Sequence, residues 1–179
     1  MQARGPLMVE HRLIARMLSV IMDALVQIES SHRVDPVFVD TAVDFIRIYA
    51  DRTHHGKEEE ILFRDLNKRP LSAEDRRVMN ELIEDHVFGR KITKAIVDAN
   101  SRYRNGDEIA LAEIAEKLQT LVEFYPKHIE KEDRHFFLPV MGYFSPEEKA
   151  AMIRAGYESD SRLLQEEFAE LVKSLEVKK

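Results

Sequence analysis

Two stretches of the chain, RTHHGKEEEILF at residues 52–63 and PKHIEKEDRHFF at residues 126–137, repeat one order of residue types. Each contains a histidine, a lysine, a run of acidic residues and then hydrophobic residues that end in phenylalanine. In each stretch a glutamate follows a histidine by four positions, and residues at this spacing share one face of an α-helix. The two pairs are His54 with Glu58 and His128 with Glu132.

A further histidine precedes each stretch, His11 in VEHRLIARM and His86 in EDHVFGRKI. The gap from this histidine to the following His-x-x-x-Glu is nearly the same in both halves, so the chain reads as one helical hairpin used twice. Short connections favour antiparallel neighbours. At about 1.5 Å of rise per residue, antiparallel packing brings all four histidines to nearly one level of a bundle.

Apolar residues recur every three or four positions almost throughout, which predicts helices. Asp35-Pro36 and Ser72 are typical helix starts, and Asn105-Gly106 is a typical helix end. Pro126 is expected to kink or interrupt the fourth helix, because proline lacks a backbone donor. We therefore predict an all-α, up-down-up-down four-helix bundle. Its first helix spans the apolar stripe at residues 14–28, the second runs from 36 to about 67, the third from 72 to 105, and the fourth starts near 107.

The clearest boundary is GYFSPEEKA, where Ser145 caps a helix, Pro146 takes its first position and Glu148 completes a capping box. The helix that follows has apolar residues on one side. We predict two units: a four-helix bundle at residues 1–144, and an amphipathic C-terminal helix at residues 145–179. This helix is expected to pack on the bundle or to lie at a homodimer interface. Its stripe includes Ile153, Leu164, Phe168, Leu171 and Leu175.

Composition narrows the class of protein. The chain has 179 residues, a formal net charge of −6 and no cysteine. The charge argues against nucleic acid or an anionic membrane as the target, and the lack of cysteine excludes disulfides and thiolate metal sites. No secretory signal or apolar segment of membrane-spanning length is visible. A cytoplasmic protein is the expectation.

The four histidines continue apolar stripes, and the two glutamates lie one turn further along the same faces. Two buried carboxylates without cations would cost several kcal/mol each, so bound metal is the better explanation. Nitrogen and oxygen donors without thiolate suit iron, manganese or zinc. Six side chains fit two metals bridged by carboxylates. The predicted ligands are His11, His54, Glu58, His86, His128 and Glu132.

Taken together, His11 and the motifs HHGKEEEILF, EDHVFGR and HIEKEDRHFF resemble the hemerythrin-like (HHE cation-binding) family over residues 6 to about 140. The resemblance implies a four-helix bundle that holds a non-haem di-iron centre with bridging carboxylates and an oxo or hydroxo bridge. Oxygen-carrying members have His-x-x-x-His in the third helix, whereas here Arg90 follows His86 by four positions. The pattern is similar to the subgroup with His, His-x-x-x-Glu, His, His-x-x-x-Glu, and leaves four histidines where carriers have five.

The resemblance implies that a small oxidant such as O2, NO or peroxide binds or reacts at the centre, in oxidative or nitrosative stress or in iron-centre maintenance. A redox or protein partner is then expected. Three alternatives remain: a non-catalytic iron- or gas-sensing interaction module, reversible O2 binding, and a metal-free helical interaction protein. The apolar face of the C-terminal helix would serve the sensing alternative.

Two pairs of neighbouring residues compete for ligand positions. His55 and Glu59 have the same spacing as His54 and Glu58, but an α-helix turns them to another face, so we expect His54. The symmetry of the two halves likewise favours Glu132 over Asp133. Tyr49 and Tyr125 lie close to the histidines in sequence and are either core aromatics or hydrogen-bond donors to a bound ligand. His135 is expected in an outer position or on the surface, and His32 in a solvated turn.

Overall fold

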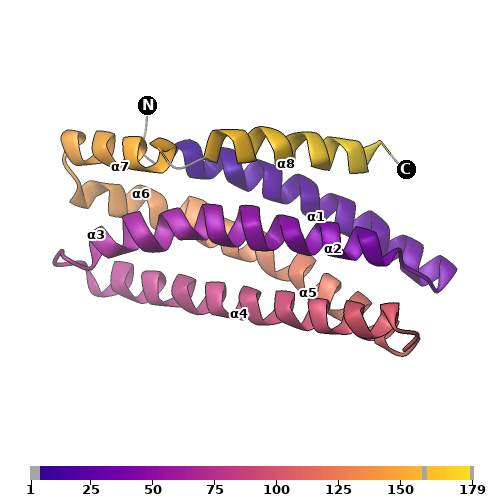
Figure 1. Cartoon of the computed structure of the whole chain (residues 1–179). Helices are drawn as coiled ribbons and strands as arrows, with labels where there is room; N and C mark the ends of the chain where they lie inside the picture. Colours follow the sequence, from indigo (N-terminus) through magenta and orange to yellow (C-terminus); the bar gives the residue numbers. More distant parts are fainter. Residues whose placement is uncertain (1–4, 159–160, 178–179) are drawn as a thin grey trace.

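The computed structural model describes residues 5–158 and 161–177, and every regular element in those ranges is helical. Four long helical runs alternate in direction and pack side by side (Figure 1). The predicted all-α bundle is therefore confirmed. The runs are α1 (Gly5–Ser31); α2 (Pro36–Asp44) continued by η1 (Phe45–His55), η2 (Glu58–Phe63) and α3 (Arg64–Leu66); α4 (Ala73–Arg104); and α5 (Ala110–Glu130) continued by η3 (Lys131–Phe136), α6 (Phe137–Val140) and η4 (Met141–Tyr143).

The predicted helix starts have the expected caps. The Asp35 side chain accepts a hydrogen bond from the Val37 amide at 2.9 Å, and Ser72 accepts one from the Asp75 amide at 3.0 Å. These contacts satisfy backbone donors that have no partner inside the helix. The third helix ends before Gly106, whose φ of 93° is a conformation that glycine adopts without strain.

Pro126 does not interrupt the fourth helix, because α5 continues through it to Glu130. Val122, Tyr125 and His128 on either side of the proline are all buried. Packing of this buried face outweighs the single backbone hydrogen bond that proline removes.

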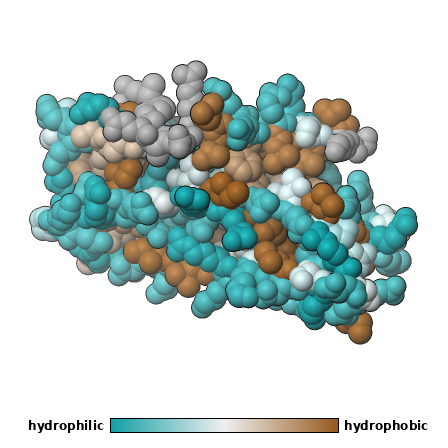
Figure 2. All heavy atoms as spheres, viewed as in Figure 1, coloured by the Kyte–Doolittle hydropathy of each residue, from teal (hydrophilic) through white to brown (hydrophobic). Residues whose placement is uncertain are grey.

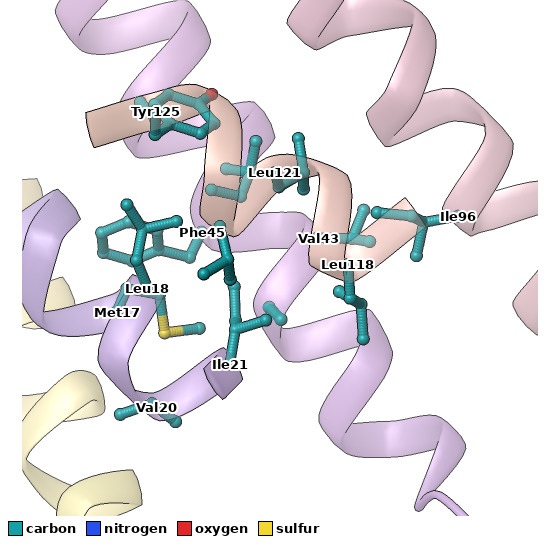
Figure 3. Packing of buried hydrophobic residues seen from close by; sticks show 14 of the residues in the cluster. Met17, Leu18, Val20, Ile21, Val43, Phe45, Ile96, Leu118, Leu121 and Tyr125 are labelled. Carbon is teal, nitrogen blue, oxygen red and sulfur yellow. The ribbon is translucent and has the colours of Figure 1, made fainter. Parts of the chain in front are cut away.

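The bundle has two apolar clusters with a polar layer between them. The larger cluster joins α1, α2, η1, α4 and α5, and Figure 3 shows Ile21, Phe45, Leu118 and Tyr125 packed within it. The smaller cluster lies at the other end of the bundle and includes Leu7, where α1 begins. The buried histidines and glutamates occupy the layer between the two clusters. On α1, for example, His11 lies between Leu7 of the smaller cluster and Ile14 of the larger one.

After the bundle the described residues form α7 (Pro146–Glu158) and α8 (Ser161–Glu176). Residues 159–160, which also belong to the predicted C-terminal helix, lie outside the described residues. The capping box is present, since Ser145 and Glu148 exchange hydrogen bonds of 2.7 and 3.2 Å. Gly156, a poor helix former, lies near the end of α7.

Helix α8 lies along α1 and η1 on one side of the bundle (Figure 1). Phe168 meets the Phe45 ring edge-on at 5.4 Å, and Val172 is fully buried. The face in Figure 2 is mainly hydrophilic, with scattered hydrophobic patches. None of the helices in the described ranges has an apolar stretch that could cross a membrane.

Candidate metal centre

Seven histidine and glutamate side chains from four helical runs meet in the polar layer. Each is at most 3% exposed. Their nitrogen and oxygen atoms form two groups of four, and within each group the atoms lie within 4.8 Å of one another. One group is His11, His54, Glu58 and Glu132, and the other is His55, Glu58, His86 and His128. The structure thus brings together all six residues expected from the sequence and adds His55.

The two glutamates connect the groups. Glu132 places Oε2 3.0 Å from His11 Nε2 and Oε1 3.1 Å from His128 Nε2. Glu58 does the same at longer range, with Oε1 3.8 Å from His54 Nε2 and Oε2 3.3 Å from His86 Nε2. Each carboxylate therefore presents one oxygen to each group, which is the arrangement a bridging ligand requires.

Contrary to the prediction from α-helical geometry, His55 does not point to another face of the helix. His55 is 2% exposed and stacks on His86 with ring centroids 3.9 Å apart, while its neighbour His54 faces His11. The reason is local: residues 45–55 form a π-helix. Its wider turn separates successive side chains by less than the 100° of an α-helix, so two adjacent histidines both point inward.

Every imidazole of the cluster has a carboxylate behind it. The Nδ1–H of His54 donates to Glu10 at 2.9 Å, and that of His86 to Glu59 at 2.6 Å. Such partners fix the ring orientation and leave Nε2 free to bind a metal. The other three pairs are His11 with Asp133 at 3.0 Å, His55 with Asp51 at 3.4 Å and His128 with Asp85 at 3.2 Å.

Asp133 and Glu59 contact the Nδ1 side of their histidines and are 26% and 31% exposed, whereas Glu132 is fully buried among the donor atoms. Glu10 and Asp85 were missed by the sequence reasoning. A signal for them was present, because an acidic residue directly precedes the first histidine of each half, as Glu10-His11 and Asp85-His86.

Three cationic side chains donate hydrogen bonds to four of these carboxylates. Lys57 bonds to Glu10, and Lys131 bonds to Asp85 at 2.8 Å. Arg90 bonds to Asp51 at 2.8 Å and to Glu59 at 2.7 Å. The network holds seven carboxylates against three cations, and the excess of negative charge equals the charge of two divalent ions.

Without metal, protons supply part of the missing positive charge. Burial acts to lower the pKa of His11, His86 and His128, but their hydrogen bonds and charge interactions with surrounding carboxylates outweigh it. These pKa values rise to about 10, 11 and 9 respectively. Burial also dominates at His55, and with repulsion from the other histidines it holds the pKa well below the usual range. Burial opposes ionisation of Glu132, yet the surrounding histidines keep its pKa well below the ordinary value.

Several buried nitrogen and oxygen atoms of the cluster have no hydrogen-bond partner. They include Nε2 of His55, His86 and His128 and both carboxylate oxygens of Glu58 and Glu132. The 3.0 and 3.1 Å contacts of Glu132 with His11 and His128 are ion-pair contacts and not directed hydrogen bonds. Buried polar atoms are rarely left in this state, and these seven atoms all come from residues of the two groups. Nitrogen and carboxylate oxygen donors without sulfur match the preferences of iron, manganese and zinc. The residues present fit a metal centre.

The two tyrosines differ in their surroundings. Tyr49 is buried, and its hydroxyl donates to Gln165 of α8. Tyr125 is also buried, with its ring centroid 6.3 Å from both the His55 and the His128 rings. His32 and His135 are exposed, as expected.

A helical bundle with buried histidine and glutamate side chains in its core defines the class as a metal-binding bundle protein. The family model described as the hemerythrin HHE cation binding domain matches residues 5–138. The chain belongs to this family, as the sequence motifs indicated. No curated protein and no solved structure gave a significant match.

Proposed function

We propose that this protein binds two non-haem iron ions and reacts there with a small oxidant such as O2, NO or peroxide. The observation that carries the proposal is the pair of buried carboxylates, Glu58 and Glu132, each of which presents one oxygen to each group of histidines. Manganese or zinc could occupy the same nitrogen and oxygen donors.

The two halves of the centre differ in their number of histidines. His55, His86 and His128 face one half, and His11 and His54 face the other, while the carboxylates serve both. The half with two histidines has fewer protein donors, so it leaves more coordination positions for an exogenous ligand. Bound iron would supply the redox chemistry, and the chain would supply a buried, preorganised set of donors.

Reversible O2 binding is the first alternative. The sequence argument against it counted four histidines, but the structure supplies a fifth from η1, His55. The histidine count therefore no longer separates an oxygen carrier from an oxidant-reactive protein.

A sensing module is the second alternative, supported by a contact between the bundle and its C-terminal helix. Tyr49 lies on η1, one turn before His54, and its hydroxyl donates to Gln165 on α8. A change in η1 would reach α8 through this bond. In either case we place the protein in oxidative or nitrosative stress or in iron-centre maintenance, with a redox or protein partner.

One experiment separates these functions. Anaerobic protein loaded with ferrous iron is mixed with O2 or peroxide, and the visible spectrum is followed. Rapid oxidation that is not reversed by removing O2 supports the proposal. A stable spectrum that disappears when O2 is lowered would identify a carrier. Hydrogen exchange in α8 that changes with oxidation state, without turnover, would identify a sensor.

A further inference from the structure

The internal repeat extends to the residues behind the histidines. In the first half Glu10 holds His54 and is bonded to Lys57, and in the second half Asp85 holds His128 and is bonded to Lys131. The two lysines occupy equal positions, since each follows the histidine of its His-x-x-x-Glu by three residues.

The acidic residues after the two bridging glutamates also correspond. Glu59 follows Glu58 and holds His86 of the second half, whereas Asp133 follows Glu132 and holds His11 of the first half. Four of the five histidine–carboxylate pairs therefore obey one internal symmetry.

The fifth pair, His55 with Asp51, breaks the symmetry. The residue after His128 is Ile129, which packs against the larger apolar cluster, so the second half has no counterpart of His55. The position that matches Asp51 is Tyr125, three residues before His128. Arg90 follows His86 by four residues, and the matching position after His11 is Ala15.

Arg90 connects the carboxylate partner of His55 with the carboxylate partner of His86. Its guanidinium bonds to Asp51 Oδ1 at 2.8 Å and to Glu59 Oε1 at 2.7 Å. The same two oxygens face His55 Nδ1 at 3.4 Å and His86 Nδ1 at 2.6 Å. The planar guanidinium group, with its fixed fork of donors, suits this double contact better than a lysine would.

The two imidazoles that Arg90 supports are stacked, with planes 9° apart and centroids 3.9 Å apart. Asp51 is 27% exposed and Glu59 31% exposed, so solvent competes for both carboxylates. Without the guanidinium the two negative charges would repel each other, and either carboxylate could turn toward water. Arg90 thus offsets the charge of both carboxylates that contact His55 and His86.

We propose that Arg90 is a positioning residue that, through Asp51 and Glu59, orients His55 and His86 and so makes the three-histidine half of the centre unlike the two-histidine half. This inference rests on the proposed two-metal function. It gives position 90 a role in the site although its side chain is not a metal ligand.

The test uses the full chain, freed of metal with a chelator and titrated with Co2+, whose visible absorption reports its ligands. Arg90→Ala is compared with Arg102→Ala, which removes another partly exposed arginine of α4 whose partners are Asp107 and Glu113. The His55→Ala variant identifies the absorption of the three-histidine half.

Wild-type protein and Arg102→Ala should bind two Co2+ ions per chain. In Arg90→Ala the ion affected by His55→Ala should bind about 10- to 100-fold more weakly, the usual effect of removing an outer partner of a metal ligand, while the other ion is unchanged. Equal weakening of both ions, or no weakening, would overturn the inference. A wild-type chain that binds no Co2+ would instead contradict the proposed function.

A double-mutant cycle checks the route of the effect. If Arg90 acts through Asp51, the combined Arg90→Ala and Asp51→Asn variant should bind the affected ion more tightly than the sum of the two single effects predicts. Arg90→Lys keeps the charge but not the fork, and should weaken the same ion. Strictly additive effects of Arg90→Ala and Asp51→Asn, or an effect of Arg90→Lys on the other ion, would count against the proposal.

Discussion

His54 donates from Nδ1 to the carboxylate of Glu10, 2.9 Å away, although Glu10 is the neighbour in sequence of a different histidine, His11. Asp85 serves His128 in the same way, although it directly precedes His86. The acidic residue before each first histidine thus ties two antiparallel helices together through the site. This crossed pairing orients the imidazoles before any metal arrives.

Removing one charge from this pairing should weaken metal binding without changing the fold. We expect Glu10→Gln and Asp85→Asn each to lower affinity about 10- to 100-fold, because the supported imidazole loses its orienting acceptor. Equilibrium competition with a coloured chelator measures the loss. Glu84→Gln is the control, since Glu84 is an exposed neighbour on the same helix as Asp85. An unchanged affinity in both site variants would contradict the role given to these carboxylates.

The His55→Ala variant should lose one metal ion per chain or bind that ion much more weakly. The reason is that His55 Nε2 is buried among the other metal-binding atoms and has no hydrogen-bond partner. The exposed histidines provide matched controls, and His32→Ala and His135→Ala should retain the full metal content. Metal analysis after gel filtration gives the result. A His55→Ala variant with wild-type content would restore the interpretation in which only His54 of this adjacent pair is a ligand.

Metal binding should compete with protons. In the metal-free protein the pKa values of His11, His86 and His128 are raised to about 10, 11 and 9, so all three imidazoles remain charged at pH 8. The pKa of His55 is lowered, so this ring is neutral. Imidazole NMR signals of metal-free protein should show this difference, whereas ordinary histidines with pKa near 6.5 would be almost fully neutral at pH 8.

The sign of the pH dependence follows from the raised pKa values. Below about pH 9 a metal must displace these protons, so affinity should rise as pH rises. The same protons stabilise the metal-free fold below pH 6.5, and this contribution is lost as pH passes through 9 to 11. Uptake of Zn2+ that is independent of pH between 6 and 8 would contradict this account.

Helix α8 should depend on the aromatic contact with the bundle. Phe168→Ala removes a ring that packs against Phe45 and Tyr49 at 5.4 and 5.6 Å. Because Phe168 is only partly buried, we expect a loss of about 1–3 kcal/mol in unfolding free energy, below the range for a fully buried phenylalanine. Faster hydrogen exchange in α8 should accompany it. Leu163→Ala, at a position 65% exposed, is the control.

Much of the fold could be predicted because helix ends are encoded locally. Asp35-Pro36, Ser72 and Ser145 each satisfy free backbone amides with side chains a few residues away, and such contacts need no knowledge of the tertiary structure. The continuation of the helix through Pro126 could not be predicted, because the benefit of burying its neighbours comes from helices distant in sequence.

The convergence of His11, His54, His86 and His128 could be predicted from equal spacing and antiparallel packing. His55 could not, because the expectation assumed α-helical geometry and residues 45–55 are π-helical. π-helical turns are rare and occur frequently at functional sites, so α-helical geometry is the ordinary expectation from a sequence. The one related feature of the sequence is Arg90, which stands four residues after His86, where the resemblance to oxygen carriers leads one to expect a fifth histidine.

The central claim is a two-metal centre bridged by Glu58 and Glu132, and metal content tests it most directly. Protein purified without chelator, after growth with iron, should contain about two irons per chain. Glu58→Ala and Glu132→Ala should each lose most of this iron, because each removes a carboxylate shared by both groups of histidines. A wild-type chain with no bound metal, or both variants with wild-type iron content, would contradict the account.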